Sequence, residues 1–113
     1  MIQIFHNSRC SKSRQCINLI EKSGKKFEII KYLVNPPTIS ELTELISKLT
    51  IEPIDLIRKK EKLWIDKFKN KTLSSKKLIE IMVKNPILIE RPIVIKGDKA
   101  VIARPIENAI KII

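Results

Sequence analysis

Short apolar runs and one amphipathic segment alternate in the first third of the chain. Residues 2–5 form a mostly apolar run typical of a buried strand. Residues 11–23 carry apolar side chains at helical spacing, and Gly24 is suited to end that helix at its C′ position. Residues 27–33 alternate in polarity and predict a second strand. This order of strand, helix and strand predicts a parallel strand pair with a right-handed connection.

The middle of the chain carries only helical patterns. After the break at Asn35-Pro36-Pro37, several short segments repeat apolar residues at helical spacing. Thr38 or Ser40 is a candidate N-cap for the first helix, Pro53 suits the first turn of the next, and Ser74 or Ser75 begins the last. The main apolar positions are Ile39, Leu42, Leu45, Ile46 and Leu49, then Leu63, Trp64 and Phe68, then Leu78, Ile79, Met82 and Val83. This block predicts three or four short helices.

The pattern returns to strands after Asn85-Pro86. Residues 92–96 and 99–103 are apolar runs joined by Gly97-Asp98, a two-residue loop typical of a hairpin with glycine at its first central position. Pro105 suits the start of a last helix. The complete order predicts an α/β fold whose central, mixed, four-stranded sheet has helices on both faces and an all-helical insertion between its second and third strands.

Length and composition set limits on this fold. A chain of 113 residues with 43% hydrophobic content can bury one core, so we expect a single domain, residues 1–113, with the helical insertion at about 38–88. No apolar run approaches the ~18 residues of a membrane span, and the first residues carry no apolar leader. We therefore expect a cytoplasmic monomer without membrane contacts, in which the two cysteines are reduced.

The net charge of +11 comes mainly from lysines scattered along the chain. Such a lysine-rich and isoleucine-rich composition is typical of an AT-biased genome. A basic surface also gives affinity for phosphates, so nucleic-acid binding stays open as one alternative. The aromatic content of 4% offers no stacking platform, however, and the chain carries no recognised nucleic-acid motif. A small anionic substrate requires fewer assumptions.

Cys10 is the candidate nucleophile. It lies between the first strand and the first helix, where free backbone N–H groups and the positive end of the helix dipole point at its sulfur. The neighbouring Arg9, Lys12 and Arg14 add positive charge. These features predict a pKa lowered from about 8.5 to roughly 3.5–7.5. Cys16 is about 9 Å further along the helix axis, too far for a disulfide, and is expected in the core.

Arginine is scarce in this lysine-rich chain, since only five of its 23 cationic residues are arginines. Three of them, Arg58, Arg91 and Arg104, stand beside breaks or turns where loops from one edge of the sheet can converge. A guanidinium group binds a tetrahedral oxyanion through paired hydrogen bonds that lysine cannot reproduce. These positions are therefore candidate oxyanion ligands.

Five motifs occur in order along essentially the whole chain. They are His6-Asn7-x-x-Cys10-x-x-Ser13-Arg14, Tyr32-Leu33-x-x-Pro36-Pro37, Leu56-Ile57-Arg58-Lys59, the run from Asn85 to Val94, and Arg104-Pro105. Together they resemble the glutaredoxin-coupled arsenate reductase family. The resemblance implies a thioredoxin-like fold and a role in arsenic detoxification.

The same resemblance implies a mechanism. Cys10 would attack arsenate and hold it as a thiol-bound arsenic ester, and glutathione with glutaredoxin would supply the electrons that release arsenite. Glutathione is then a co-substrate, with no tightly bound cofactor and no metal. The other implied site residues are the oxyanion-binding Arg58, Arg91 and Arg104, the thiolate-supporting His6 and Ser13, and a cis proline, Pro92, that faces the cysteine.

Two departures from related sequences bear on function. The family frequently has proline where this chain has Ser8, so we expect a less rigid loop before the cysteine. Ser13 stands where a second cysteine would complete a Cys-x-x-Cys motif, which removes an internal dithiol cycle at the helix start. The same scaffold also serves redox-responsive regulators that bind RNA polymerase, and thiol reductases with other substrates. The regulators typically keep the second cysteine, so Ser13 and the three arginines favour the enzyme.

Overall fold

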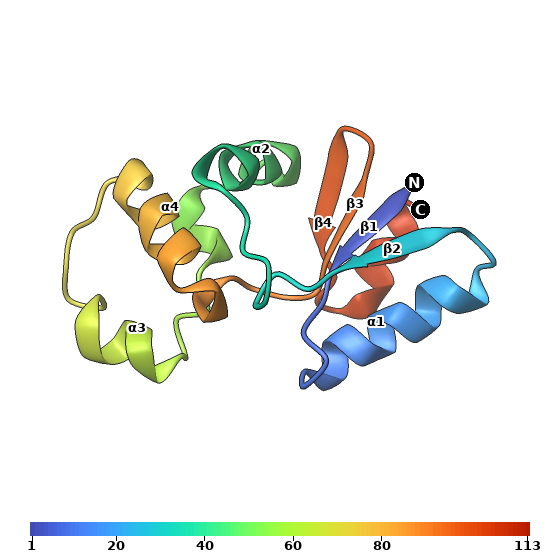
Figure 1. Cartoon of the computed structure of the whole chain (residues 1–113), viewed down its shortest axis with the longest axis horizontal. Helices are drawn as coiled ribbons and strands as arrows, with labels where there is room; N and C mark the ends of the chain where they lie inside the picture. The colour runs from blue at the N-terminus through green and yellow to red at the C-terminus, as the bar shows by residue number, and fades with distance from the viewer. The chain divides into compact units, whose positions relative to one another are not determined.

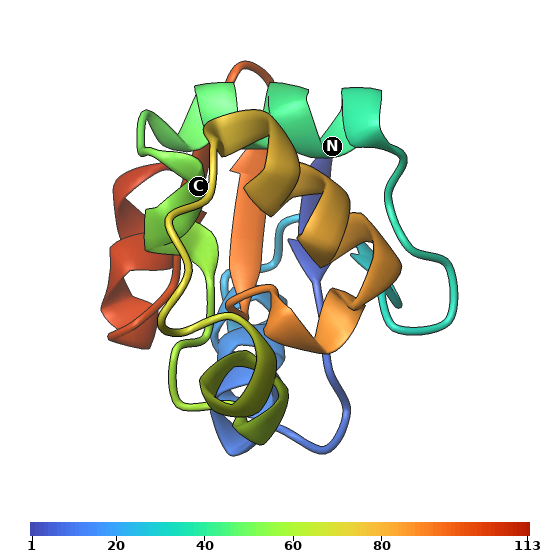
Figure 2. The same cartoon turned by 90° about the vertical axis from the view of Figure 1, so that its left-hand side faces the viewer.

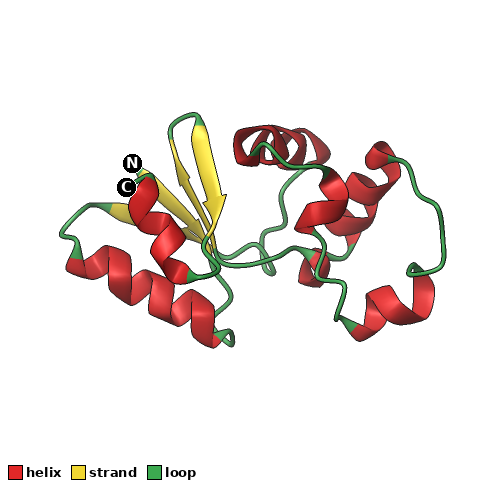
Figure 3. Ribbon diagram, turned by 180° about the vertical axis from the view of Figure 1, so that it is seen from behind, coloured by secondary structure: helices red, strands yellow, loops and turns green.

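The computed structural model covers residues 1–113 and divides into two compact units, each described on its own. The sheet unit comprises Met1–Asn35 and Arg91–Ile113, and the helical unit comprises Pro36–Glu90 (Figures 1 and 3). The elements in chain order, with η marking 3₁₀ helices, are β1 (Ile2–Phe5), α1 (Ser11–Lys22), β2 (Phe27–Ile30), α2 (Ile39–Leu49), η1 (Pro53–Leu56), α3 (Lys62–Lys67), α4 (Ser75–Lys84), η2 (Pro86–Leu88), β3 (Ile93–Lys96), β4 (Lys99–Ile102) and η3 (Ile106–Lys111). This order confirms the predicted α/β class with helices inserted between the second and third strands.

The sheet unit is built on a mixed sheet with the strand order β2-β1-β3-β4. β1 runs parallel to β2, with Ile2 opposite Phe27. β3 runs antiparallel to β1 with Ile93 opposite Phe5, and β4 completes the hairpin with Ile102 opposite Ile93. The end of β1, the start of β3 and the end of β4 therefore lie at one edge of the sheet. This register, which matches the predicted thioredoxin-like topology, brings together the segments that carry the candidate site.

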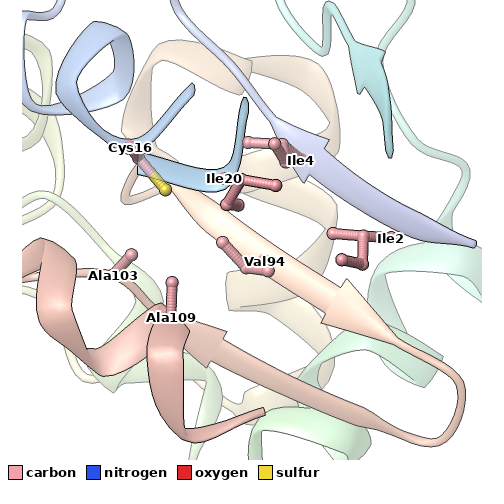
Figure 4. Packing of buried hydrophobic residues seen from close by; sticks show 7 residues of the cluster. All are labelled: Ile2, Ile4, Cys16, Ile20, Val94, Ala103 and Ala109. Atoms are coloured by element: carbon pink, nitrogen blue, oxygen red, sulfur yellow. The ribbon is translucent and has the colours of Figure 1, made fainter. Parts of the chain in front are cut away.

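One face of the sheet is covered by α1 and η3, which contact each other (Figures 1 and 3). Alternate residues of a strand point to the same face of the sheet, and residues four apart lie on the same face of a helix. The apolar side chains of the strands therefore pack against the apolar side chains of the helices. The buried cluster consists of Ile2, Ile4, Cys16, Ile20, Val94, Ala103 and Ala109 (Figure 4). Burying one large aliphatic side chain of this kind contributes roughly 1.5–3 kcal/mol. Both helices of this unit lie on the same face, and the expectation of helices on both faces of the sheet stays a prediction.

Two helices of the helical unit, α2 and α4, begin at polar caps that the sequence offered. Thr38 forms a capping box, in which its hydroxyl accepts from the Glu41 N–H at 3.1 Å and the Glu41 carboxylate accepts from the Thr38 N–H at 2.9 Å. Ser74 caps α4 by accepting from the Lys77 N–H at 3.2 Å. α2 and α4 contact each other (Figure 2) and bury Leu42, Leu45, Ile46, Leu49, Leu78, Ile79, Ile81 and Met82. No helix of either unit combines the length and the apolar character needed to cross a membrane.

Three strand boundaries differ from the predicted ones. β4 ends at Ile102, one residue early. β2 ends at Ile30, three residues early, because the Tyr32 N–H donates to the Ile30 carbonyl at 3.1 Å and turns the chain. The Tyr32 ring is then buried and stacks on Phe5, with ring centroids 5.6 Å apart. β3 begins at Ile93, one residue late, because Pro92 has no N–H to donate to the strand ladder. The predicted hairpin loop is present, and Gly97 has the positive φ of +62° that its turn requires.

Candidate active site

Cys10 occupies the N-cap of α1 with an extended backbone, φ −94° and ψ 120°. Its side chain is only 8% exposed, and this burial alone raises the pKa of the thiol. Hydrogen bonds from the Ser13 N–H, the Arg91 side chain and the Ser13 hydroxyl, together with the charge of Arg91, outweigh burial and lower the pKa to about 7. A thiol with this pKa exists to a substantial extent as the thiolate at neutral pH.

The origin of this activation differs in part from the prediction. The helix start contributes as expected, through the N–H of Ser13. The activating positive charge comes from Arg91, near the other end of the chain. The cationic residues close to Cys10 in sequence are Arg9, Lys12 and Arg14. All three are exposed, and none of them is among the groups that lower the pKa of the Cys10 thiol.

Arg91 and Arg104 reach Cys10 because of the strand register. Arg91 precedes β3 and Arg104 follows β4, so both lie at the edge of the sheet where β1 ends. The Arg104 Nη2 lies 3.5 Å from the Cys10 Sγ, and the Arg104 Nε donates to the Arg91 carbonyl oxygen at 2.7 Å. The second contact fixes the guanidinium plane of Arg104 against the backbone. The Arg91–Pro92 peptide bond is cis, as the resemblance implied, and so is Arg104–Pro105, which the sequence did not indicate.

Three hydrogen bonds restrain the loop that leads into Cys10. The Cys10 N–H donates to the Asn7 carbonyl at 2.9 Å, and the Arg9 N–H donates to the Asn7 Oδ1 at 3.0 Å. The Arg14 Nη1 donates to the Ser8 carbonyl oxygen at 2.8 Å. Asn7 and Arg14 thus hold the segment in which Ser8 replaces the proline frequent in the family.

The two residues implied to support the thiolate differ in their surroundings. Ser13 is fully buried, and its hydroxyl both accepts from the Asn7 N–H at 3.4 Å and helps to lower the pKa of Cys10. The His6 Nδ1 is buried without a hydrogen-bond partner, and burial, followed by the charges of Arg14 and Lys31, lowers the pKa of the imidazole. His6 is therefore neutral at pH 7. Cys10 is not among the groups that shift the pKa of His6. The role of His6 in supporting the thiolate therefore stays a prediction.

Arg58 belongs to the helical unit, where its surroundings are well defined. Backbone hydrogen bonds of 2.8 and 2.9 Å pair the segments 56–58 and 88–90. Across this pairing the Arg58 Nη1 donates to the Glu90 Oε1 at 2.8 Å. Sequence reasoning missed Glu90, although a carboxylate directly before Arg91 within a recognised motif was a usable signal. The convergence of Arg58 with Cys10 stays a prediction.

Cys16 lies in the core, as predicted. Its side chain is fully buried, burial raises its pKa to about 11, and it forms no disulfide. A thiol with this pKa carries almost no thiolate at neutral pH. The structure also holds no group of three or more His, Cys, Asp or Glu side chains placed to bind a metal ion.

Comparisons with known proteins extend this description. A family model described as ArsC family matches residues 5–112. An arsenate reductase of Neisseria meningitidis serogroup A / serotype 4A is 40% identical over 109 residues, which cover 95% of this chain and 93% of the relative. The uncharacterized protein YfgD of Escherichia coli K12 is 40% identical over 114 residues, covering 99% and 96%. The solved structure of an arsenate reductase from Vibrio cholerae has a TM-score of 0.95 at 37% identity, covering 99% of this chain and 97% of that one.

Proposed function

Because the chain belongs to the ArsC family, we propose that it is an arsenate reductase with Cys10 as its nucleophile. The observation that carries this proposal is a thiol with a pKa of about 7 whose sulfur receives hydrogen bonds from two arginines, Arg91 and Arg104. The names of the Neisseria and Vibrio relatives support arsenate as the substrate. For the reduction to occur, the site must stabilise the negative charges of the thiolate and of arsenate.

A thiolate and arsenate are both anions, so their approach must be neutralised. Guanidinium groups beside the sulfur supply charge-assisted hydrogen bonds at the place where negative charge accumulates. The Cys10 sulfur forms a bond to arsenic while one arsenate oxygen takes up protons and leaves as water. Arg91 and Arg104 can hold the remaining oxygens during this step. Arg58 is the third proposed oxyanion ligand.

The reduction of arsenic from +5 to +3 then requires two electrons. Two external thiols supply them: they become one disulfide, arsenite is released and Cys10 returns as a thiol, so the water lost when the ester formed is the only water of the whole reaction. This chain offers no resolving thiol, because Ser13 replaces the second cysteine of a dithiol motif and Cys16 is buried with a raised pKa. We propose that glutathione with glutaredoxin is the donor, in the reducing cytoplasm.

The donor is tested by measuring arsenite production by the purified protein. We expect turnover with glutathione and glutaredoxin, and little turnover when thioredoxin with its reductase replaces them. Equal rates with the two systems would contradict the proposed donor but not the role of Cys10.

The nucleophile is tested with two matched substitutions. Cys10→Ser removes the thiolate and should abolish arsenite production. Cys16→Ser makes the same chemical change at a thiol that stays protonated, and it should leave turnover within a few-fold of the wild-type rate. Comparable losses in the two variants would refute the single-cysteine mechanism.

A further inference from the structure

Arg14 contacts the chain on both sides of Cys10. Its backbone N–H donates to the Cys10 carbonyl at 3.1 Å, which is the first hydrogen bond of α1. Its side chain reaches back toward the preceding loop, where the Nη1 donates to the Ser8 carbonyl oxygen at 2.8 Å. A hydrogen bond from a charged donor is stronger than one between neutral groups. The proposed mechanism makes no use of this side-chain contact.

The segment before the helix is a closed turn. The Cys10 N–H donates to the Asn7 carbonyl at 2.9 Å, which closes a β-turn, and the Arg9 N–H donates to the Asn7 Oδ1 at 3.0 Å. Cys10 then has an extended backbone, and α1 begins at Ser11. The first N–H groups of a helix have no partner inside the helix. The Ser13 N–H is one of them, and it lowers the pKa of the Cys10 thiol more than any other group does.

A helix that began at Arg9, two residues earlier, would remove this donor from the sulfur. Backbone N–H groups in an α-helix donate to the carbonyl four residues before them. The Ser13 N–H would then donate to the Arg9 carbonyl, and the Lys12 N–H would donate to the Ser8 carbonyl. In the structure the guanidinium group of Arg14 occupies the Ser8 carbonyl instead. The side chain of Arg14 therefore favours the turn over the earlier helix start.

We propose that Arg14 is a positioning residue: by holding the turn it keeps the start of α1 in place, so that the Ser13 N–H stays directed at the Cys10 sulfur. Arg14 is exposed and is not among the groups that lower the pKa of Cys10, so it acts through the backbone and not through its charge. For the turnover of arsenate this inference rests on the proposed function, whereas the activation of the thiol is measured without arsenate.

Other charged groups also face this thiol, and every variant below retains them. Arg91 precedes β3, Arg104 follows β4, and the Arg104 Nη2 lies 3.5 Å from the sulfur. His6 follows β1, and burial, then the charges of Arg14 and Lys31, lower its pKa. Removal of Arg14 raises the pKa of His6 toward its ordinary value. A proton gained by His6 would favour the thiolate, which is opposite to the change that we expect.

The first test compares the pH dependence of Cys10 alkylation in two matched variants. Arg14→Ala removes an exposed arginine together with its contact to the turn, and we expect the midpoint of the iodoacetamide rate to rise by about 0.5–1 pH unit. Arg9→Ala removes an exposed arginine whose hydrogen bond in the turn comes from the backbone, so the midpoint should move by less than about 0.2 unit. A wild-type midpoint in Arg14→Ala, or equal shifts in the two variants, would overturn the inference.

The second test separates the start of the helix from charge. Glycine is a much poorer helix former than alanine, and both are uncharged. In the Arg14→Ala background, Arg9→Gly should return the midpoint to within about 0.3 unit of the wild-type value, because glycine disfavours the earlier helix start. Arg9→Ala in the same background should leave the midpoint raised. Equal midpoints in the two double variants, or a higher midpoint with glycine from a merely loosened turn, would overturn the inference.

A third measurement observes the start of the helix directly by NMR. The Cα chemical shift of Cys10, recorded at low pH where the thiol is protonated, should move toward the helical value in Arg14→Ala. It should move back when Arg9→Gly is added. An unchanged chemical shift beside a raised alkylation midpoint would overturn the role of the helix start.

Turnover gives the last readout. At pH 7 we expect kcat/KM for arsenate to fall about two- to fivefold in Arg14→Ala relative to the wild-type protein, because less thiolate is present. At about pH 9 the two proteins should be nearly equal, since the thiol is then ionised in both. A loss of the same size at both pH values would overturn the inference. If the wild-type protein makes no arsenite, the proposed function is refuted, while the alkylation midpoints still decide the role of Arg14.

Discussion

At the scale of single residues, Cys10 depends on a serine three positions away and on arginines more than eighty positions away. The sequence predicted the activated thiol from its place at a helix start, which is a local property. The sequence attributed the lowering of the pKa to the wrong cationic residues, Arg9, Lys12 and Arg14. Charges adjacent in sequence can point into solvent, where water and salt screen them. The contribution of Arg91 depends on strand pairing that a single sequence does not reveal.

The pH dependence of Cys10 alkylation follows from its pKa. The thiolate is the reactive form, so the rate with iodoacetamide should rise with pH, reach half of its maximum near pH 7, and level off by about pH 8–9. Mass spectrometry of the modified peptide measures the rate at Cys10 separately from that at Cys16. A midpoint near the ordinary cysteine pKa of about 8.5 would contradict the activation of the thiol.

Replacing the site arginines by lysine separates charge from geometry. Arg91→Lys and Arg104→Lys keep the charge but lose the paired donors, and each charge-assisted hydrogen bond is worth roughly 1.5–3 kcal/mol. We expect kcat/KM for arsenate to fall about ten- to a hundredfold in each, and also in Arg58→Lys. Alkylation of Cys10 by the neutral reagent iodoacetamide is the control and should be largely retained. Wild-type arsenate kinetics in all three variants would refute the oxyanion site.

At the scale of elements, local chemistry made much of the structure predictable. β1, the cap at Thr38 and the turn at Gly97 depend on side chains within a few residues, and all three are present. The end of β2 depends on a distant contact, the stacking of Tyr32 on Phe5, and was wrong by three residues. The ion pair of Arg58 with Glu90 also joins distant segments, and pattern analysis has no access to such pairs.

A substitution at Ser8 tests how the conformation of the loop before α1 contributes to stability. No hydrogen bond uses the Ser8 N–H, and Ser8 follows Asn7 in a turn closed by the Cys10 N–H, a position that suits proline. Ser8→Pro should therefore stabilise the protein by about 0.4–1 kcal/mol by reducing the freedom of the unfolded chain. Chemical denaturation measures the change, and arsenite production should persist. A destabilised or inactive variant would mean that the loop needs a backbone that proline cannot adopt.

At the scale of the whole molecule, charge is divided unevenly between the two units. The sheet unit holds twelve Lys and Arg against four Asp and Glu, hence +8, whereas the helical unit holds eleven against eight, hence +3. Ion pairs within the helical unit offset part of its charge; they join Lys48 to Glu44, Arg58 to Glu90, Lys62 to Asp66 and Lys77 to Glu80. The lysines are scattered along the sequence, but their charges are not balanced equally in the two units. The unit that carries Cys10 has the larger net positive charge.

This charge should favour anionic reagents at low ionic strength. The ratio of the Cys10 alkylation rates with iodoacetate, an anion, and iodoacetamide, which is neutral, should fall at least about threefold between roughly 10 and 500 mM salt. Using the ratio cancels effects of salt on the thiolate itself. A ratio that does not change with salt would mean that the net charge of the sheet unit does not act at Cys10.

The long sequence separation within the site has a consequence for biosynthesis. Cys10 is synthesised well before Arg104, which follows it by 94 residues. Until the hairpin of β3 and β4 pairs with β1, the cysteine lacks the hydrogen bond and the positive charge of Arg91. A chain in which this hairpin has not yet paired with β1 therefore holds a thiol whose pKa is less strongly lowered. Full activation of Cys10 thus follows the assembly of the sheet, so the thiol is less reactive towards oxidants and stray electrophiles while the sheet is incomplete.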